Sequence, residues 1–102
     1  MKDIIKKATI VAWTQAIMLP LFAQEITVTG TVTEANGEPL IGAVVQQRDK
    51  RVQTVTDMDG HYTINVERGS LLSFTYIGYL PYAAKAASRV DVTMVEDNQS
   101  LN

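Results

Sequence analysis

The chain has 102 residues, of which nine are basic, eleven are acidic and none is cysteine. This length fits one small domain, and the lack of cysteine excludes both a disulfide framework and the cysteine-linked anchor of a bacterial lipoprotein. The net charge of −2, without any basic stripe interleaved with aromatic residues, argues against a nucleic-acid-binding protein.

Residues 1–23 have the three-part pattern of a secretory signal peptide. Three lysines lie within the first seven residues, residues 8–22 are mostly apolar, and Ala23 offers a small residue for cleavage. The apolar run of 15 residues is shorter than the roughly 20 that span a bilayer. We expect cleavage after Ala23 and export, with an uncleaved anchor or an amphipathic surface helix as alternatives. The 79 residues that follow carry a net charge of −4, which fits a periplasmic or surface domain.

The rest of the chain predicts short strands separated by turns. Residues 26–34 alternate between apolar and polar side chains, as a half-buried antiparallel strand does, and Gly30 predicts a bulge or a close backbone approach. Asn36 and Gly37 then predict a tight structural turn. Residues 82–87 fit a strand or, because of their alanines, a helical turn. The other expected strands are residues 43–48, 52–56, 61–66, 71–76 and 89–96.

The stretch from Thr54 to Val66 predicts a β-hairpin around the turn Asp57-Met58-Asp59-Gly60. Gly60 can adopt a positive φ without steric cost, and the Asp57 carboxylate can accept hydrogen bonds from amides just after it. Asp57, Asp59 and Gly60 are therefore expected to be structural turn residues. The strand after the turn would present one apolar face to a core.

Strand-like runs recur about every ten residues, and no segment after residue 23 has helical periodicity. This pattern gives six or seven short strands and predicts an all-β fold, a Greek-key β-sandwich of two sheets preceded by the signal peptide. The expected boundaries are 1–23 for the signal peptide, 24–96 for the sandwich and 97–102 for a polar tail or linker.

Candidate reactive residues are few. Asp57 and Asp59 could open a calcium loop, but an EF-hand needs an acidic residue at the twelfth position, where this chain has Arg68. His61 is the single histidine, and zinc or copper sites need several ligands. No serine lies in a Gly-x-Ser-x-Gly elbow, and no glycine-rich loop could cradle a phosphate. We therefore expect no catalytic residue, no metal and no cofactor, hence no enzyme.

Tyr76, Tyr79 and Tyr82 gather around Gly78 and Pro81. They are candidates for a partner surface, either for sugars or for a protein. Capping of one end of the sandwich core is the structural alternative.

Four blocks of the chain, in order, resemble one known domain family. They are residues 29–33, 36–43, 54–62 and 74–79. Together they are similar to the carboxypeptidase-regulatory-like domain found at the N-terminus of SusC-like TonB-dependent outer-membrane receptors of Bacteroidetes. The resemblance covers roughly residues 25–96 and implies a transthyretin-like (prealbumin-like) seven-stranded β-sandwich, in which these blocks have structural roles.

The resemblance also implies a function. The chain would be a non-enzymatic periplasmic accessory domain of a SusC-like TonB-dependent outer-membrane nutrient transporter, or would be truncated from one. Its implied partners are the plug and barrel that follow in cis in full-length relatives, a SusD-like lipoprotein and the TonB system. The chain ends at Asn102, so we expect contact with the membrane only through a barrel that this chain does not contain. The alternative is a free-standing exported binding or adhesion module that uses the tyrosine cluster.

Overall fold

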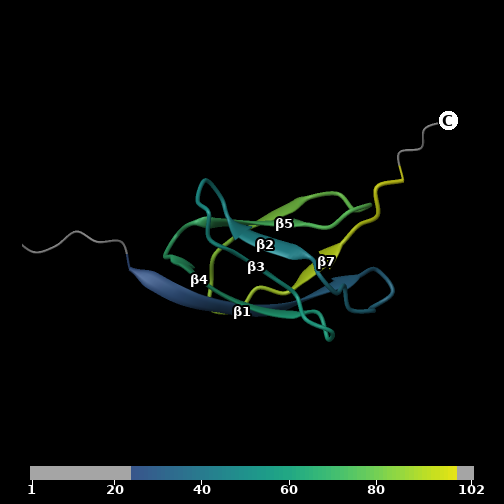
Figure 1. Ribbon diagram of the computed structural model, residues 1–102, viewed down its shortest axis with the longest axis horizontal. Coiled ribbons are helices and arrows are strands. Elements are labelled where there is room, and N and C mark those ends of the chain that lie inside the picture. The colour runs from purple at the N-terminus through teal and green to yellow at the C-terminus, as the bar shows by residue number, and fades with distance from the viewer. Residues whose placement is uncertain (1–23, 99–102) are drawn as a thin grey trace, which may run out of the picture.

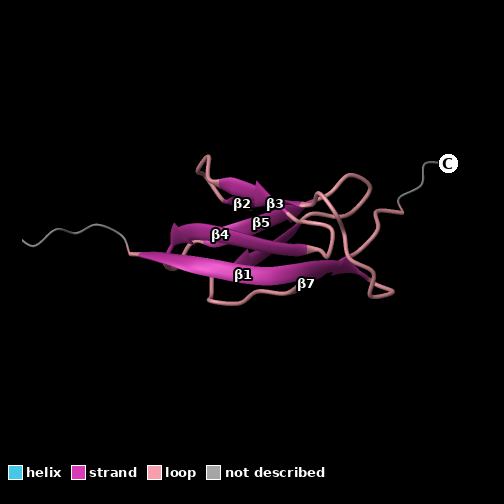
Figure 2. Ribbon diagram, turned by 60° about the horizontal axis from the view of Figure 1, so that its bottom comes forward, coloured by secondary structure: helices cyan, strands magenta, loops and turns pink. Residues whose placement is uncertain are grey.

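The computed structural model describes residues 24–98, so the expected signal peptide and residues 99–102 lie outside the described part. Residues 24–98 form seven strands in two sheets and contain no helix (Figure 1, Figure 2). The prediction of an all-β sandwich of seven strands is confirmed. Within these residues no helix has the length and apolar character that crossing a bilayer requires. The strands are β1 (Glu25–Glu34), β2 (Val44–Gln47), β3 (Gln53–Val55), β4 (His61–Glu67), β5 (Leu71–Thr75), β6 (Tyr82–Lys85) and β7 (Val92–Met94).

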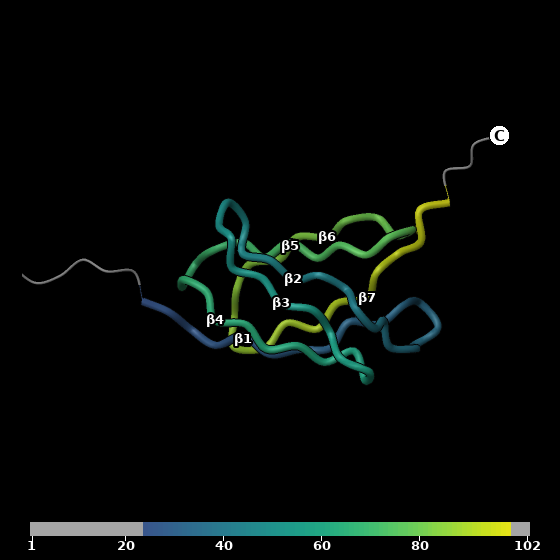
Figure 3. The backbone as a smooth tube through the Cα atoms, viewed as in Figure 1, coloured from purple at the N-terminus to yellow at the C-terminus, as the bar shows by residue number. Residues whose placement is uncertain are grey.

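The two sheets have the strand orders β4-β1-β7 and β3-β2-β5-β6. Strand β1 is the centre of the first sheet, antiparallel to β4 on one side and parallel to β7 on the other. Figure 3 shows the two layers, with β1 and β4 in one and β2, β5 and β6 in the other. The described chain begins at one end of the sandwich and leaves at the opposite end (Figure 1).

The core lies between the layers and is built by alternation along each strand. In β4, for example, Tyr62, Ile64 and Val66 are buried and the residues between them are exposed. Burying one large apolar side chain contributes about 1.5–3 kcal/mol, so these positions hold the two sheets together. The buried apolar residues are Val28, Val32, Leu40, Ala43, Val45, Tyr62, Ile64, Val66, Leu72, Phe74, Val92 and Met94.

The turn from Asp57 to Gly60 joins the two sheets, so the prediction of a hairpin here is wrong. Strand β3 before the turn pairs with β2, whereas β4 after it pairs with β1. The turn is tight, since the Gly60 N–H donates to the Asp57 carbonyl oxygen over 2.9 Å. After the turn, the chain nevertheless crosses to the other layer. There β4 pairs with β1, which is a longer antiparallel partner than the three-residue strand β3. Consecutive strands do pair antiparallel in the β2–β3 and β5–β6 connections.

The ambiguous segment after Pro81 is a strand, which makes the helical alternative wrong. Residues Tyr82–Lys85 form β6, antiparallel to β5. Ala84 lies opposite Leu72 and is half-buried against the core. Backbone pairing with β5 thus outweighs the helix propensity of the alanines, which is a weak effect of a few tenths of a kcal/mol.

Candidate functional site

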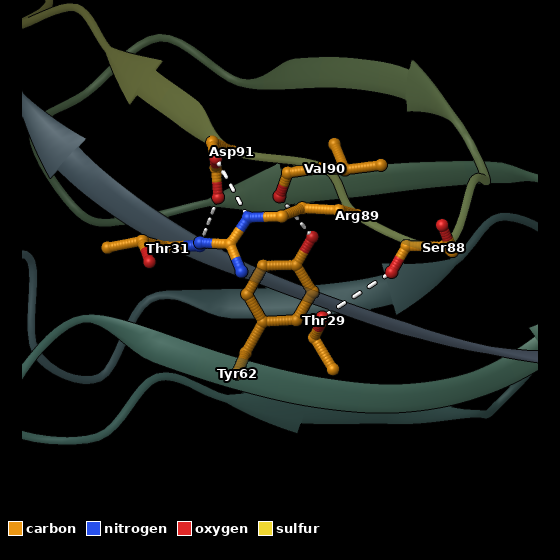
Figure 4. Close-up of polar contacts among 7 residues, drawn as sticks. All are labelled: Thr29, Thr31, Tyr62, Ser88, Arg89, Val90 and Asp91. Atoms are coloured by element: carbon orange, nitrogen blue, oxygen red, sulfur yellow. Dashed lines mark hydrogen bonds and ion pairs between the residues drawn. The ribbon is translucent and has the colours of Figure 1, made fainter.

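Residues 88–91, which we call the strap, run along β1 just before β7 (Figure 4). The Val90 N–H donates to the Thr29 carbonyl oxygen over 2.9 Å. The Thr31 N–H donates to Asp91 Oδ1 over 2.9 Å. These bonds use the backbone groups of β1 that point away from β4. The strap therefore begins the parallel pairing that β7 continues.

The Asp91 carboxylate is held from two sides. Arg89 Nε lies 3.1 Å from Asp91 Oδ2, while the other carboxylate oxygen accepts the Thr31 amide. The hydrogen bond from Arg89, with a smaller contribution from the Thr31 amide, lowers the pKa of Asp91 below its usual value. The ion pair is more than half exposed, so its main effect is to position the strap rather than to add stability.

Gly30 leaves the space that the strap and the Tyr62 ring occupy. A Cβ atom on Gly30 would lie 1.8 Å from the Val90 carbonyl oxygen and 2.9 Å from the Tyr62 ring. The Tyr62 hydroxyl donates to the same Val90 oxygen over 2.6 Å (Figure 4). Burial, with a smaller contribution from the Asp91 charge, raises the pKa of Tyr62 to about 12. The close approach predicted at Gly30 is confirmed, and the uninterrupted β1–β4 register shows no bulge there.

The turn before β4 is organised around a carboxylate and a glycine. Asp57 Oδ1 accepts the backbone N–H groups of Asp59 and His61, each over 2.9 Å. These bonds lower the pKa of Asp57 below its usual value, and the bond from the His61 amide has the larger effect. Gly60 has φ of 77°, and a Cβ atom there would lie 2.6 Å from the Val32 carbonyl oxygen. A side chain at this position would thus be strained and would also clash.

The side chains of Asp57, Asp59 and His61 converge on one exposed place, where one possible metal-ligand atom from each lies within 4.8 Å of the others. Considered separately in the sequence, neither the Asp57–Asp59 pair nor His61 predicted a metal site. Their alternate spacing across the turn is the signal that could have indicated the cluster. Exposed groups of this kind are common without an ion. Because Asp57 Oδ1 already accepts two amides, we keep the prediction that these residues hold no metal.

The second turn from the sequence lies at the end of β1. Asn36 Oδ1 accepts the Glu38 N–H over 2.9 Å, and the Gly37 N–H donates to the Glu34 carbonyl oxygen over 2.8 Å. Gly37 has φ of 91°, a conformation that favours glycine. The side chain and the backbone of this turn are therefore both engaged within the turn itself.

The three tyrosines divide into a pair and a separate residue. The rings of Tyr76 and Tyr79 have centroids 5.5 Å apart, near the end where the chain leaves the sandwich. The Tyr79 hydroxyl donates to Glu34 Oε1 over 2.7 Å, and this bond raises the pKa of Tyr79 to about 12. Tyr82 instead lies against Phe74, with ring centroids 6.2 Å apart, and is 49% exposed. The structure thus brings together two of the three predicted residues.

A hollow of about 380 Å³ opens beside Tyr79. Its lining combines two carboxylates and one phenol with apolar side chains, and it contains no histidine, serine, threonine or lysine. Nucleophilic catalysis needs a nucleophile next to a base, and this lining does not offer that pair. The lining residues are Glu34, Ala35, Asn36, Tyr79, Met94, Val95, Glu96 and Asn98.

Curated relatives of the chain are much longer proteins. The chain is 34% identical over 86 residues to the TonB-dependent receptor SusC of Bacteroides thetaiotaomicron, which covers 84% of this chain and 9% of that receptor. It is 38% identical over 78 residues to a TonB-dependent receptor of Formosa agariphila, which covers 74% of this chain and 8% of that protein. The chain therefore spans less than a tenth of the length of these relatives.

The fold has a counterpart among solved structures. A chain in the crystal structure of a type II Cohesin-X-Dockerin complex from Acetivibrio cellulolyticus matches with a TM-score of 0.56. The match covers 69% of this chain and 56% of that chain at 18% identity, so the likeness concerns the fold alone. At the level of sequence, the profile of the CarboxypepD_reg-like domain matches residues 28–102. The chain belongs to the CarboxypepD_reg-like domain family.

Proposed function

We propose that this chain supplies an exported, non-enzymatic accessory domain of a TonB-dependent outer-membrane nutrient transporter, located on the periplasmic side. The observation that carries this proposal is the similarity to the TonB-dependent receptor SusC, which covers 84% of this chain but only 9% of the receptor. A chain of this size corresponds to one accessory domain rather than to a complete transporter.

The geometry supports a structural rather than a catalytic role for the residues that the sequence singled out. The Asp57 carboxylate binds the amides of its own turn, and Asn36 does the same in the other turn. The Tyr62 hydroxyl and the space at Gly30 serve the contact with the strap. These groups are engaged in holding the backbone, which leaves them poorly placed for acid–base chemistry on a substrate.

We propose the partners that the family resemblance implies, and the similarity to TonB-dependent receptors supports the transporter among them. They are a plug and barrel in the same polypeptide of the longer proteins, a SusD-like lipoprotein and the TonB system. The DNA after the codon for Asn102 tests this relation. Plug and barrel sequence in any reading frame would support it, whereas unrelated sequence would remove its main support.

Export is part of the proposal and rests on residues 1–23. Expression of the full chain in a bacterium related to those of the curated relatives, followed by intact mass measurement, tests it. We expect a periplasmic product that begins at Gln24. A product that retains Met1 would contradict both the cleavage and the boundary.

A second candidate is a free-standing exported module that binds saccharides or a partner protein through its tyrosines. The exposure of Tyr82 (49%), and of Ile77 (88%) in the connection between β5 and β6, favours this candidate. A saccharide panel with purified residues 24–102 separates the two, because the accessory domain is expected to bind no saccharide alone. Binding that is lost in Tyr82→Ala and kept in Thr27→Ala, on the exposed face of β1, would favour the second candidate.

A further inference from the structure

One asparagine of the chain has a sequence context in which its side-chain amide can react with the backbone that follows it. Asparagine occurs at positions 36, 65, 98 and 102, and only Asn36 is followed by glycine. Glycine has no Cβ to obstruct the approach of its nitrogen to the preceding side chain, and its backbone reaches conformations closed to other residues. Asn65 is followed instead by Val66, which is β-branched and buried. Asn36 is therefore the asparagine whose amide is least hindered from such attack.

The reaction is the loss of ammonia through a succinimide ring. The Gly37 nitrogen, after its proton has passed to a base in the solvent, forms a bond to Asn36 Cγ. The Cγ–Nδ2 bond breaks, and Nδ2 takes up a proton and leaves as ammonia. Water then opens the ring at either carbonyl. Aspartate results where the new bond breaks, and isoaspartate where the original peptide bond breaks, so water is the only co-reactant.

The surroundings of Asn36 leave room for this reaction. Asn36 and Gly37 are both exposed, and a Cβ atom on Gly37 would meet nothing within 4 Å. The pair Asp59–Gly60 has the same spacing of carbonyl and glycine, but Gly60 is buried and its Cβ would lie 2.6 Å from the Val32 carbonyl oxygen. Steric confinement thus protects the turn before β4 and does not protect Asn36.

Hydrogen bonds engage both reacting groups in the folded turn. The Gly37 N–H, whose proton must leave, donates to the Glu34 carbonyl oxygen over 2.8 Å. Asn36 Oδ1, on the carbon that would be attacked, accepts the Glu38 N–H over 2.9 Å. The Glu34 N–H in turn donates to the Glu38 carbonyl oxygen over 2.9 Å, which closes residues 34–38 as one unit. The Gly37 nitrogen can turn toward Asn36 Cγ only when its bond to Glu34 has broken.

We propose that Asn36 is a site of spontaneous deamidation that the closed turn suppresses, so that position 36 gains a carboxylate only while the turn is open. The new charge would join Glu34 and Glu96 in the lining of the hollow described above. Aspartate keeps an oxygen that can accept the Glu38 N–H, so the turn can close again. Isoaspartate lengthens the backbone by a methylene, and the bond from Gly37 to Glu34 is then lost. The modification records the time that a chain has spent with this turn open.

Mass spectrometry of residues 24–102 tests the proposal, since all described core residues and hydrogen bonds lie within residues 24–98. The reference is a synthetic peptide of residues 31–42, which contains Asn36 and Gly37 without the rest of the fold. Both are incubated at mildly alkaline pH, and the fragment that holds Asn36 is monitored for exchange of NH₂ for OH. We expect the folded chain to react at least about tenfold more slowly, because the turn bonds must open first. In urea its rate should rise to that of the peptide.

Equal rates in the folded chain and in the peptide would overturn the suppression by the turn. A peptide that keeps its amide would overturn the assignment of Asn36 as a reactive site. In the folded chain Asn65 should stay unmodified throughout, which serves as an internal control.

Two variants at position 38 test the side-chain bond. Glu38→Pro removes the N–H that Asn36 Oδ1 accepts and leaves the Asn36–Gly37 pair unchanged. Relative to a peptide of its own sequence, this variant should deamidate faster than the wild type. Glu38→Gln keeps the N–H and should match the wild type, and circular dichroism establishes that both variants are folded. A folded Glu38→Pro chain that reacts as slowly as the wild type would overturn the role of this bond.

Discussion

Gly30 and Tyr62 lie opposite each other in the β1–β4 pair, and the missing side chain of one is the space that the ring of the other needs. The Tyr62 hydroxyl passes through this space to the Val90 carbonyl oxygen, 2.6 Å away. A contact between two neighbouring strands thereby fixes the strap, which delivers β7 to the other side of β1. The pairing of all three strands of this sheet therefore requires the space that Gly30 leaves.

Replacement of Gly30 by alanine tests this dependence. The new Cβ would meet the Val90 carbonyl oxygen at 1.8 Å, so either the strap or the Tyr62 ring must move. Overpacking of this kind costs about 3 kcal/mol, and we expect a loss of that size in the free energy of unfolding by urea. Thr27→Ala, on the exposed face of the same strand, should cost about 1 kcal/mol or less. Equal losses in the two variants would contradict the role assigned to Gly30.

Replacement of Tyr62 by phenylalanine removes one hydrogen bond and leaves the Val90 carbonyl oxygen without this donor. The ring and its packing against Phe74 are kept, so the expected loss in the free energy of unfolding is about 1–2 kcal/mol. Hydrogen exchange of the Val90 amide should also become faster, because the strap is held less firmly. A variant as stable as the wild type would show that the hydroxyl is not needed.

Alkaline pH should destabilise the fold through the same hydroxyl. An unfolded tyrosine ionises near pH 10, whereas the folded pKa of Tyr62 is about 12. The folded form thus holds its proton more tightly, so the contribution of Tyr62 is complete below pH 10 and is lost as pH rises toward 12. The wild type should therefore lose stability between pH 10 and 12 relative to a variant that lacks this hydroxyl.

Urea unfolding between pH 8 and 12 measures this slope (the pKa of Tyr79 is also about 12, so the wild type alone is not sufficient). The difference between the wild type and Tyr62→Phe isolates the contribution of Tyr62. We expect that difference to shrink as pH rises. Parallel curves over the whole range would contradict the raised pKa.

The Asp57 turn should make stability sensitive to acid. The folded pKa of Asp57 is lowered by the amides that it accepts, so its contribution is present above the usual value and is lost as pH falls below it. Asp57→Asn keeps an acceptor oxygen but removes the charge, so it should lower the urea midpoint at pH 7. As pH falls, the midpoint of this variant should change less than that of the wild type. Asp59→Asn is the matched control, because the Asp59 carboxylate forms no hydrogen bond within the turn. Identical midpoints for the two variants would contradict this account of the turn.

Local pattern in the sequence was sufficient to predict most strands, because each strand buries alternate residues against a single core. The alternation from Ile26 to Glu34 and the apolar set Tyr62, Ile64 and Val66 both reflect one face turned inward. Gly30 was also informative, since a glycine in a strand marks a close backbone approach. The sequence could not show that the approaching atom belongs to Val90, because the parallel contact joins residues far apart in the chain.

The pairing of strands across the Asp57–Gly60 turn could not be predicted from the turn itself. Its hydrogen bonds are local, and the same residues would serve a hairpin or a crossing between sheets. Which of the two forms depends on β1 and β2, which offer better partners to the two flanking strands. The tyrosine cluster shows the same limit, since Phe74, rather than a neighbour in sequence, determines where Tyr82 lies.

The central claim is that this domain serves a TonB-dependent transporter, and domain replacement in a relative tests it most directly. In the TonB-dependent receptor SusC of Bacteroides thetaiotaomicron, residues 24–98 of this chain would replace the matching segment, and growth dependent on that receptor would be measured. We expect the replaced receptor to support growth like the original, and the same receptor carrying Gly30→Ala to support it less well. A replaced receptor that reaches the outer membrane with a folded domain yet fails to support growth would contradict the claim.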